Sequence, residues 1–169
     1  SSASDRIARL AAEMRRLDAL QKALRLLAAR QRTELELRKA LQSFAPGEVD
    51  SALARVKELG YINDRETARA RARTRVGQGE APRLAARKLS AQGIAAADAR
   101  AAASEAAEGA GEEELAARAL YRRLRGRKPA SEREKLRLLR ALIAKGHRPS
   151  VAARALGMTW EGDDDLEET

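Results

Sequence analysis

The stretch Leu59–Gly77, LGYINDRETARARARTRVG, shows how this chain starts and ends its helices. Gly60 stands where a helix commonly closes in the left-handed conformation, and Asn63 with Glu66 three residues later forms a capping box for the next helix. Arginines then alternate with small residues, which is formally a strand pattern. Because alanine favours helices and is a poor strand former, the stretch predicts a helix over 64–76.

Similar start and stop signals divide the rest of the chain. Thr33 with Glu36, and Ser131 with Glu134, form two further capping boxes, while glycines and prolines mark the breaks. Much of the apolar fraction is alanine, and aromatic residues make up only 2% of the chain. We therefore expect an all-α protein, with helices near residues 5–27, 34–41, 48–59, 64–76, 83–91, 95–108, 112–124, 131–145 and 150–156.

The first expected helix carries an apolar stripe with steps of three and four residues. The stripe begins with Ile7, Leu10, Met14 and Leu17 and continues through three more leucines. A partner-binding coiled coil would hold its heptads for longer, so we interpret the stripe as the packing face of a long N-terminal helix.

Three leucines, Leu41, Leu89 and Leu142, mark an internal repeat with spacings of 48 and 53 residues. Each lies two positions after a basic residue and precedes a turn with glycine and a second helix. An arginine-rich third helix closes the first two units. Units this small bury little surface alone, so we expect an elongated tandem array. The predicted parts are the N-terminal helix (1–31), a first three-helix unit (32–77), a second (78–126), a third, partial unit (127–158) and a flexible acidic tail (159–169).

The composition excludes several classes of site. The 169 residues include no cysteine and one histidine, His147, which rules out disulfides, thiolate metal sites and multi-histidine metal sites. No phosphate-binding loop motif occurs. We expect no catalytic residue, metal or cofactor, and therefore no enzyme. No stretch has the roughly 20 apolar residues of a membrane helix, and the start lacks a secretory pattern, so we expect a cytoplasmic monomer.

The net positive charge lies in the residues that precede the acidic tail. Residues 1–160 hold all 34 basic residues but only 19 of the 25 acidic ones, a net charge of +15. Such an excess points to an anionic partner. Because no aromatic cluster accompanies the arginines, we expect DNA to be held through its backbone, without sequence preference. The candidate binding residues are Arg69, Arg71, Arg73, Arg75, Arg83, Arg87, Lys88, Arg118, Arg122, Arg123, Arg125, Arg127 and Lys128.

Several segments together resemble the RecX regulatory proteins of bacteria. They include Ala23–Arg30, Glu34–Arg38, Gly60–Asp64 followed by Ala68, Gly79–Leu84 and Leu89–Ile94. Their order and spacing match across roughly residues 23–156. The main departure is Thr67, where the family usually has an aromatic residue.

The resemblance implies a function. RecX proteins bind the RecA recombinase filament and lower its ATPase, strand-exchange and coprotease activities, and they also bind single- and double-stranded DNA. The expected partner is thus the RecA filament, with the basic residues as its contacts. The alternative is an architectural protein that binds DNA itself without sequence preference.

Overall fold

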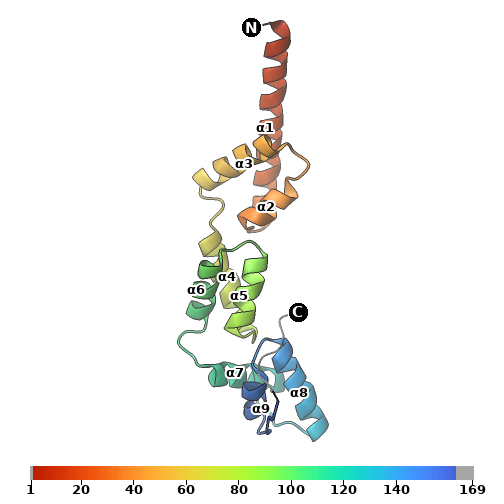
Figure 1. Ribbon diagram of the computed structural model, residues 1–169, viewed down its shortest axis with the longest axis vertical. Helices are drawn as coiled ribbons and strands as arrows, with labels where there is room; N and C mark the ends of the chain where they lie inside the picture. The colour runs from red at the N-terminus through yellow and green to blue at the C-terminus, as the bar shows by residue number, and fades with distance from the viewer. Residues whose placement is uncertain (1, 163–169) are drawn as a thin grey trace. The chain divides into compact units, whose positions relative to one another are not determined.

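The computed structural model describes residues 2–162, and this part of the chain consists of helices and the turns that join them (Figure 1). No strand occurs among these residues, which confirms the all-α class. The predicted acidic tail falls largely on 163–169, outside the described residues. The helices are α1 (Ala3–Ala29), α2 (Glu34–Ala40), α3 (Pro46–Glu58), α4 (Asp64–Gly77), α5 (Pro82–Ala91), α6 (Ala96–Ala106), α7 (Glu112–Leu124), α8 (Glu132–Ala144) and α9 (Pro149–Ala155).

The chain divides into two compact units. The first comprises Ser1–Thr67 with Gln92–Ile94, and the second comprises Ala68–Ala91 with Ala95–Thr169. Helix α4 begins in the first unit and continues into the second. The finer division into tandem three-helix units stays a prediction.

The core of the first unit forms where the C-terminal half of α1 crosses α3. Ala19 and Ala23 on α1 are fully buried, and Leu53 and Val56 on α3 belong to the same apolar cluster. Because an alanine side chain is a single methyl group, α1 can approach α3 closely. Helix α2 adds Leu37, which is also fully buried.

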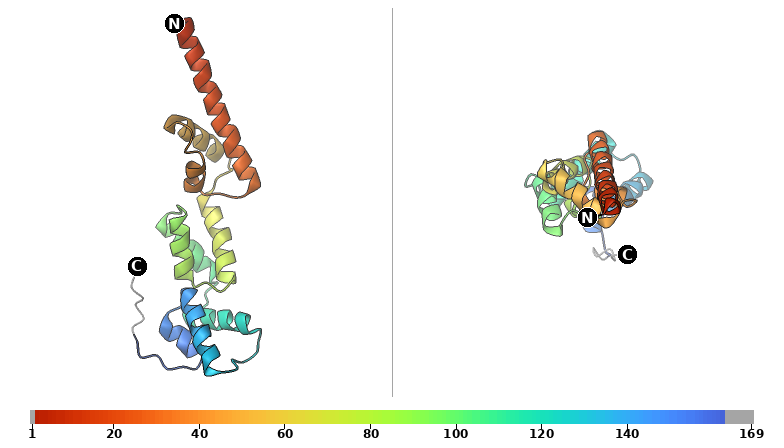
Figure 2. Two further views of the ribbon diagram at one scale, coloured as in Figure 1. Left: turned by 90° about the vertical axis from the view of Figure 1, so that its right-hand side faces the viewer. Right: turned by 90° about the horizontal axis from the view of Figure 1, so that it is seen from above.

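The N-terminal half of α1 extends past α2 and α3 (Figure 2). Its apolar residues Ile7, Leu10, Met14 and Leu17 are 57–68% exposed. At about 100° per residue, these four side chains lie on the opposite side of the helix from Ala19 and Ala23. The interpretation of this stripe as a packing face is therefore wrong for its first four residues.

Thr67, the departure from the RecX pattern, is fully buried near the start of α4. Its hydroxyl has no hydrogen-bond partner among the described residues. A buried hydroxyl without a partner lowers stability, because it has given up its hydrogen bonds to water. The position thus holds a small, fully buried polar side chain.

The second unit contains a core rich in alanine and one rich in leucine. Helices α5 and α6 pack through small residues such as Ala85, Ala99 and Ala102. Helices α7, α8 and α9 instead surround larger side chains, including Leu139 and Leu142. The difference follows from the alanine-rich sequence of α6, which offers no side chain longer than a methyl group to that core.

Two equivalent hydrogen bonds, one in each unit, tie a helix start to a distant turn. In the first unit, the Thr33 hydroxyl donates to the carbonyl of Gln92 at 2.5 Å. In the second, the backbone N–H of Ala81 donates to the carbonyl of Lys145 at 2.8 Å. Gln92 and Lys145 each precede the glycine that follows a marker leucine, so the sequence repeat reappears as a repeated contact.

Each of these turns contains a glycine that cannot take a side chain, because a neighbouring leucine already occupies the space. A Cβ added at Gly93 would overlap the side chain of Leu35, and one at Gly146 would lie 2.5 Å from the Cβ of Leu84. Gly93 and Gly146 also have φ of +94° and +88°, a region that other residues rarely adopt. Both turns therefore require glycine for conformation and for space.

Candidate functional site

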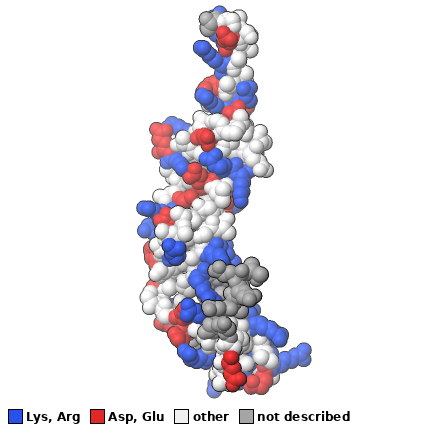
Figure 3. Space-filling view, in the orientation of Figure 1, with Lys and Arg blue, Asp and Glu red and all other residues white. Residues whose placement is uncertain are grey.

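All thirteen predicted binding residues lie in the second compact unit, on α4, α5 and α7 and in the turn that follows α7. On the face drawn in Figure 3, basic side chains lie over α5 and along α8, with acidic side chains interspersed. The cations therefore share one unit, but ion pairs divide them into two groups.

In the first group, the basic side chains form ion pairs with acidic residues of the same unit. Arg69 pairs with Glu105 at 3.2 Å, and Arg118 pairs with Glu114 at 2.5 Å. These side chains are more than half exposed, so each pair contributes at most about 1 kcal/mol to stability. A partner's phosphate or carboxylate can compete for such arginines at little cost.

Arg75 and Lys88 are held more firmly, because they share the buried carboxylate of Glu80. Oε1 of Glu80 accepts from Arg75 at 3.4 Å and also from Lys88. Glu80 is only 7% exposed, and its Oε2 is buried with no partner among the described residues. Removing either cation would leave a buried charge poorly compensated. These two residues therefore stabilise the fold rather than offer free charge.

Arg127 is held by Glu134. Two of its guanidinium nitrogens donate to this carboxylate, at 2.5 and 3.2 Å, and the backbone N–H of Ala130 donates to it at 2.6 Å. Chiefly through the Arg127 hydrogen bond, these contacts lower the pKa of Glu134 from 4.5 to about 2. The interaction fixes the turn between α7 and α8.

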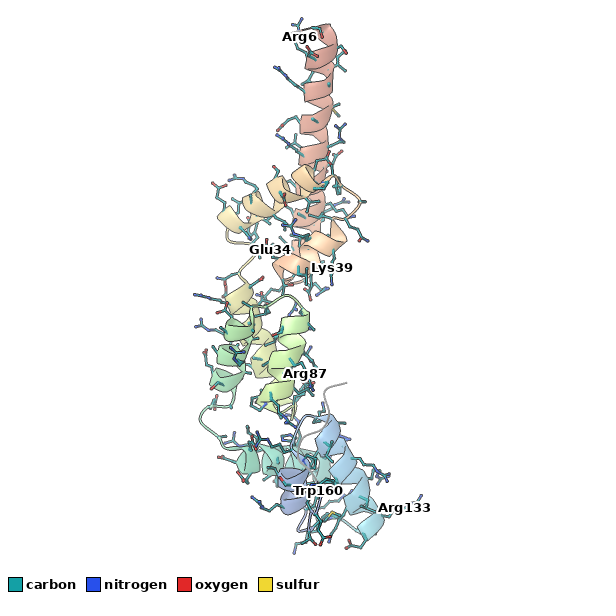
Figure 4. All side chains as sticks on the ribbon, in the orientation of Figure 1. Arg6, Glu34, Lys39, Arg87, Arg133 and Trp160 are labelled. Carbon is teal, nitrogen blue, oxygen red and sulfur yellow. The ribbon has the colours of Figure 1, made fainter. Side chains whose placement is uncertain are left out.

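The second group is exposed and has no acidic partner in the part of the chain that the structure describes. Arg73 and Arg87 lie on α4 and α5 (Figure 4 labels Arg87), while the others lie around the end of α7. Arg83 is exposed too, although its Nε donates to the carbonyl of Gly146 at 2.6 Å. Arg71 is half-buried and does not belong to this group. The cations at the end of α7 are Arg122, Arg123, Arg125 and Lys128.

Helix α8 adds a row of arginines that was not among the predicted residues. Arg133, Arg137 and Arg140 are exposed, and their spacing places them on one face of the helix. With Arg127 they line an open groove of about 800 Å³ beside the turn that precedes α8. Figure 4 shows Arg133 projecting away from α8. The same i, i+4, i+7 spacing, read in the sequence after the Ser131 cap, would have found this row.

The arrangement is suited to binding an extended anion. Guanidinium groups make paired hydrogen bonds to phosphates and carboxylates. The described residues contain no group of three or more histidine, aspartate or glutamate side chains that could hold a metal ion. No helix in the same part of the chain is both long and apolar enough to cross a bilayer.

Comparisons with known proteins fit this architecture. Residues 19–55 match the family model described as RecX, first three-helix domain. A segment of 68 residues is 41% identical to the regulatory protein RecX of Syntrophotalea carbinolica, and covers 39% of this chain and 44% of that protein. The chain therefore spans less than half the length of this curated relative, and over that part it is similar to RecX proteins.

Solved RecX structures share the fold. A crystal structure of regulatory protein RecX matches with a TM-score of 0.67 at 23% identity, over 93% of this chain and 78% of that one. RecX from Lactobacillus salivarius matches with a TM-score of 0.61 at 19% identity, over 86% and 96%. The family model covers α2, part of α1 and most of α3, which carry none of the thirteen predicted residues. The assignment of those thirteen residues as binding residues therefore depends on their own geometry.

Proposed function

We propose that this protein acts as RecX proteins do: it binds the filament of the RecA recombinase in the cytoplasm and lowers its ATPase, strand-exchange and coprotease activities. It binds DNA as an accessory contact, without sequence preference, and catalyses no reaction itself. The similarity of part of the chain to RecX proteins supports the partner. The observation that carries the mechanism is the set of exposed arginines on α7 and α8 of the second unit that have no acidic partner among the described residues.

The ion pairs decide which of these arginines provide a clean test. Reversing Arg75 would disturb the buried Glu80 and so confuse binding with folding. Arg122 and Arg123 are exposed and have no acidic partner among the described residues. Their combined reversal to glutamate changes the charge by four units and leaves the core untouched.

The experiment measures inhibition of the RecA ATPase on single-stranded DNA by the wild-type chain and by Arg122→Glu/Arg123→Glu. The matched control is Arg6→Glu/Arg9→Glu, which changes the charge equally on the exposed part of α1. We expect the α7 variant to need at least tenfold more protein for half-inhibition, and the α1 control to behave like the wild type. Equal loss in both variants would show that only net charge matters, and no loss in either would exclude the α7 arginines.

A further inference from the structure

A cavity of about 360 Å³ lies within the second unit, between α5, α6, the start of α7 and the turn from α8 to α9. Its apolar wall includes Ala86, Ala103, Ala107, Leu115 and Val151. Three of these are alanines, whose methyl groups cannot fill the space between the helices. The cavity therefore follows directly from the alanine-rich sequence of α5 and α6.

The rim of this cavity is basic. Arg83, Arg100 and Arg148 contribute three guanidinium groups, against the single carboxylate of Glu112. Arg148 lies 3.7 Å from Glu112, whereas Arg100 is exposed and has no partner among the described residues. Arg83 uses its Nε to bind the carbonyl of Gly146, so its two terminal nitrogens are available. Two guanidinium groups are thus free to bind an anion beside an apolar wall.

His147 completes the lining and adds no positive charge at neutral pH. It is 3% exposed, and burial lowers its pKa below the ordinary 6.5. Its Nε2 lies 2.9 Å from the carbonyl of Gly79, which can only accept, so Nε2 carries the proton. The other ring nitrogen, Nδ1, is then unprotonated and can only accept a hydrogen bond.

The size and lining of the cavity select among ligands. A volume of about 360 Å³ is at the small end for binding sites and suits one large apolar side chain with an adjacent carboxylate. The lining contains no Phe, Tyr or Trp, and its one ring, the imidazole of His147, is buried, so a nucleobase would have no exposed ring to stack on. Arg83 belongs both to this rim and to the predicted basic residues, so a protein bound to those residues also reaches the cavity.

We propose that this cavity anchors an acidic peptide segment of a partner protein. A leucine- or phenylalanine-sized side chain of the segment enters the alanine-lined space, and a neighbouring carboxylate binds Arg83 and Arg100. The inference rests on the proposed function only in taking the partner to be a protein.

The test uses the full chain and a fluorescein-labelled peptide, Glu-Asp-Glu-Leu-Phe-Asp-Glu-Asp, followed by fluorescence anisotropy. A second peptide replaces Leu-Phe with Ser-Ser, which keeps the charge but removes the anchor. We expect the second peptide to bind at least tenfold more weakly. Equal affinity for the two peptides, or no saturable binding of the first, would overturn the proposal.

Chain variants locate the binding. Arg100→Gln removes a rim charge and should weaken binding by up to about fivefold, the scale of one exposed ion pair. Arg9→Gln, which removes an exposed arginine of α1 outside the cavity and outside the proposed binding residues, should change affinity less than twofold. Ala103→Leu fills the space and should abolish the difference between the two peptides. Equal effects of Arg100→Gln and Arg9→Gln would show that binding depends only on the net charge of the chain, and would overturn the proposal.

A competition experiment tests whether the cavity binds a peptide or a small organic acid. Hexanoate carries a carboxylate on an apolar chain without a peptide, and should displace the labelled peptide only at concentrations at least a hundredfold above the peptide's Kd. Displacement at concentrations near that Kd would make the cavity a small-acid site and overturn the peptide assignment. Because no recombinase is present, failure here leaves filament inhibition unaffected, and failure of filament inhibition leaves these measurements unaffected.

Discussion

Replacing Gly146 with alanine tests the turn between α8 and α9, which also borders the cavity. Gly146 has a φ of +88°, and an added Cβ would lie 2.5 Å from the Cβ of Leu84 on α5. The substitution therefore meets two separate obstacles. The backbone must hold a conformation unfavourable for alanine, and α5 must move or the turn must shift.

The two contributions can be estimated separately. A left-handed conformation costs a residue with a side chain about 1–2 kcal/mol. Forcing an extra methyl group into a packed contact costs about 1–3 kcal/mol more. Gly146→Ala should therefore lower the free energy of unfolding by about 2–5 kcal/mol.

Two other glycines of the same unit separate these contributions. Gly157 has a φ of +68° but no atom within 4 Å of an added Cβ, so Gly157→Ala should cost only the conformational part. Gly77, the last residue of α4, has neither obstacle, and Gly77→Ala should be neutral or stabilising. Urea unfolding followed by circular dichroism gives the three values. The reasoning fails if Gly146→Ala costs no more than Gly157→Ala.

Three further substitutions probe other features. Glu134→Gln removes a carboxylate whose pKa is lowered to about 2, so its stabilisation is complete above about pH 4.5 and is lost as the pH falls towards 2. Over this pH range, the free energy of unfolding of the wild type should fall more steeply than that of Glu134→Gln. The control Glu132→Gln should show the same pH dependence as the wild type. Equal pH dependence of the wild type and Glu134→Gln would contradict this. Thr67→Val should raise the free energy of unfolding by about 1 kcal/mol, because the buried hydroxyl has no partner, and a loss of stability would show that the hydroxyl is satisfied. In thermal or urea unfolding, Leu10→Ser should change the free energy of unfolding by less than about 0.5 kcal/mol. Leu37→Ala should lower it by about 2–5 kcal/mol. Losses of similar size in the two variants would place the α1 stripe in the core.

The helix pattern was largely predictable, because its start and stop signals are local. The capping boxes at Thr33 and Ser131 were expected, and in the structure both side chains accept the N–H three residues on. Gly60 and Gly146 were expected to close helices, and both have positive φ. Local hydrogen bonding depends on residues close in sequence, so one sequence suffices to predict it.

The packing of α1 was not predictable from its stripe. The apolar spacing of Ile7 and Leu10 shows which side chains share a face but not whether another element covers that face. The contact with α3 is instead made by Ala19 and Ala23, which carry little apolar surface and so contribute little to the pattern.

The distinction between free and paired arginines also depends on the fold. Arg69 finds its acidic partner 36 residues away, and Arg75 and Lys88 meet at a glutamate that the turn after α4 buries. No spacing rule links such residues. The α8 row was accessible to sequence reasoning, because Arg133, Arg137 and Arg140 follow a simple helical spacing.

Under the proposed function, the arginines of the second unit bind a protein filament in preference to DNA alone. The most direct measurement compares the affinity of the chain for preassembled RecA filaments with its affinity for the same DNA without RecA, across a salt series. We predict at least tenfold tighter binding to the filament near physiological salt, with a smaller salt dependence than for bare DNA. Equal affinities with the same steep salt dependence would contradict the account and favour an architectural DNA-binding protein.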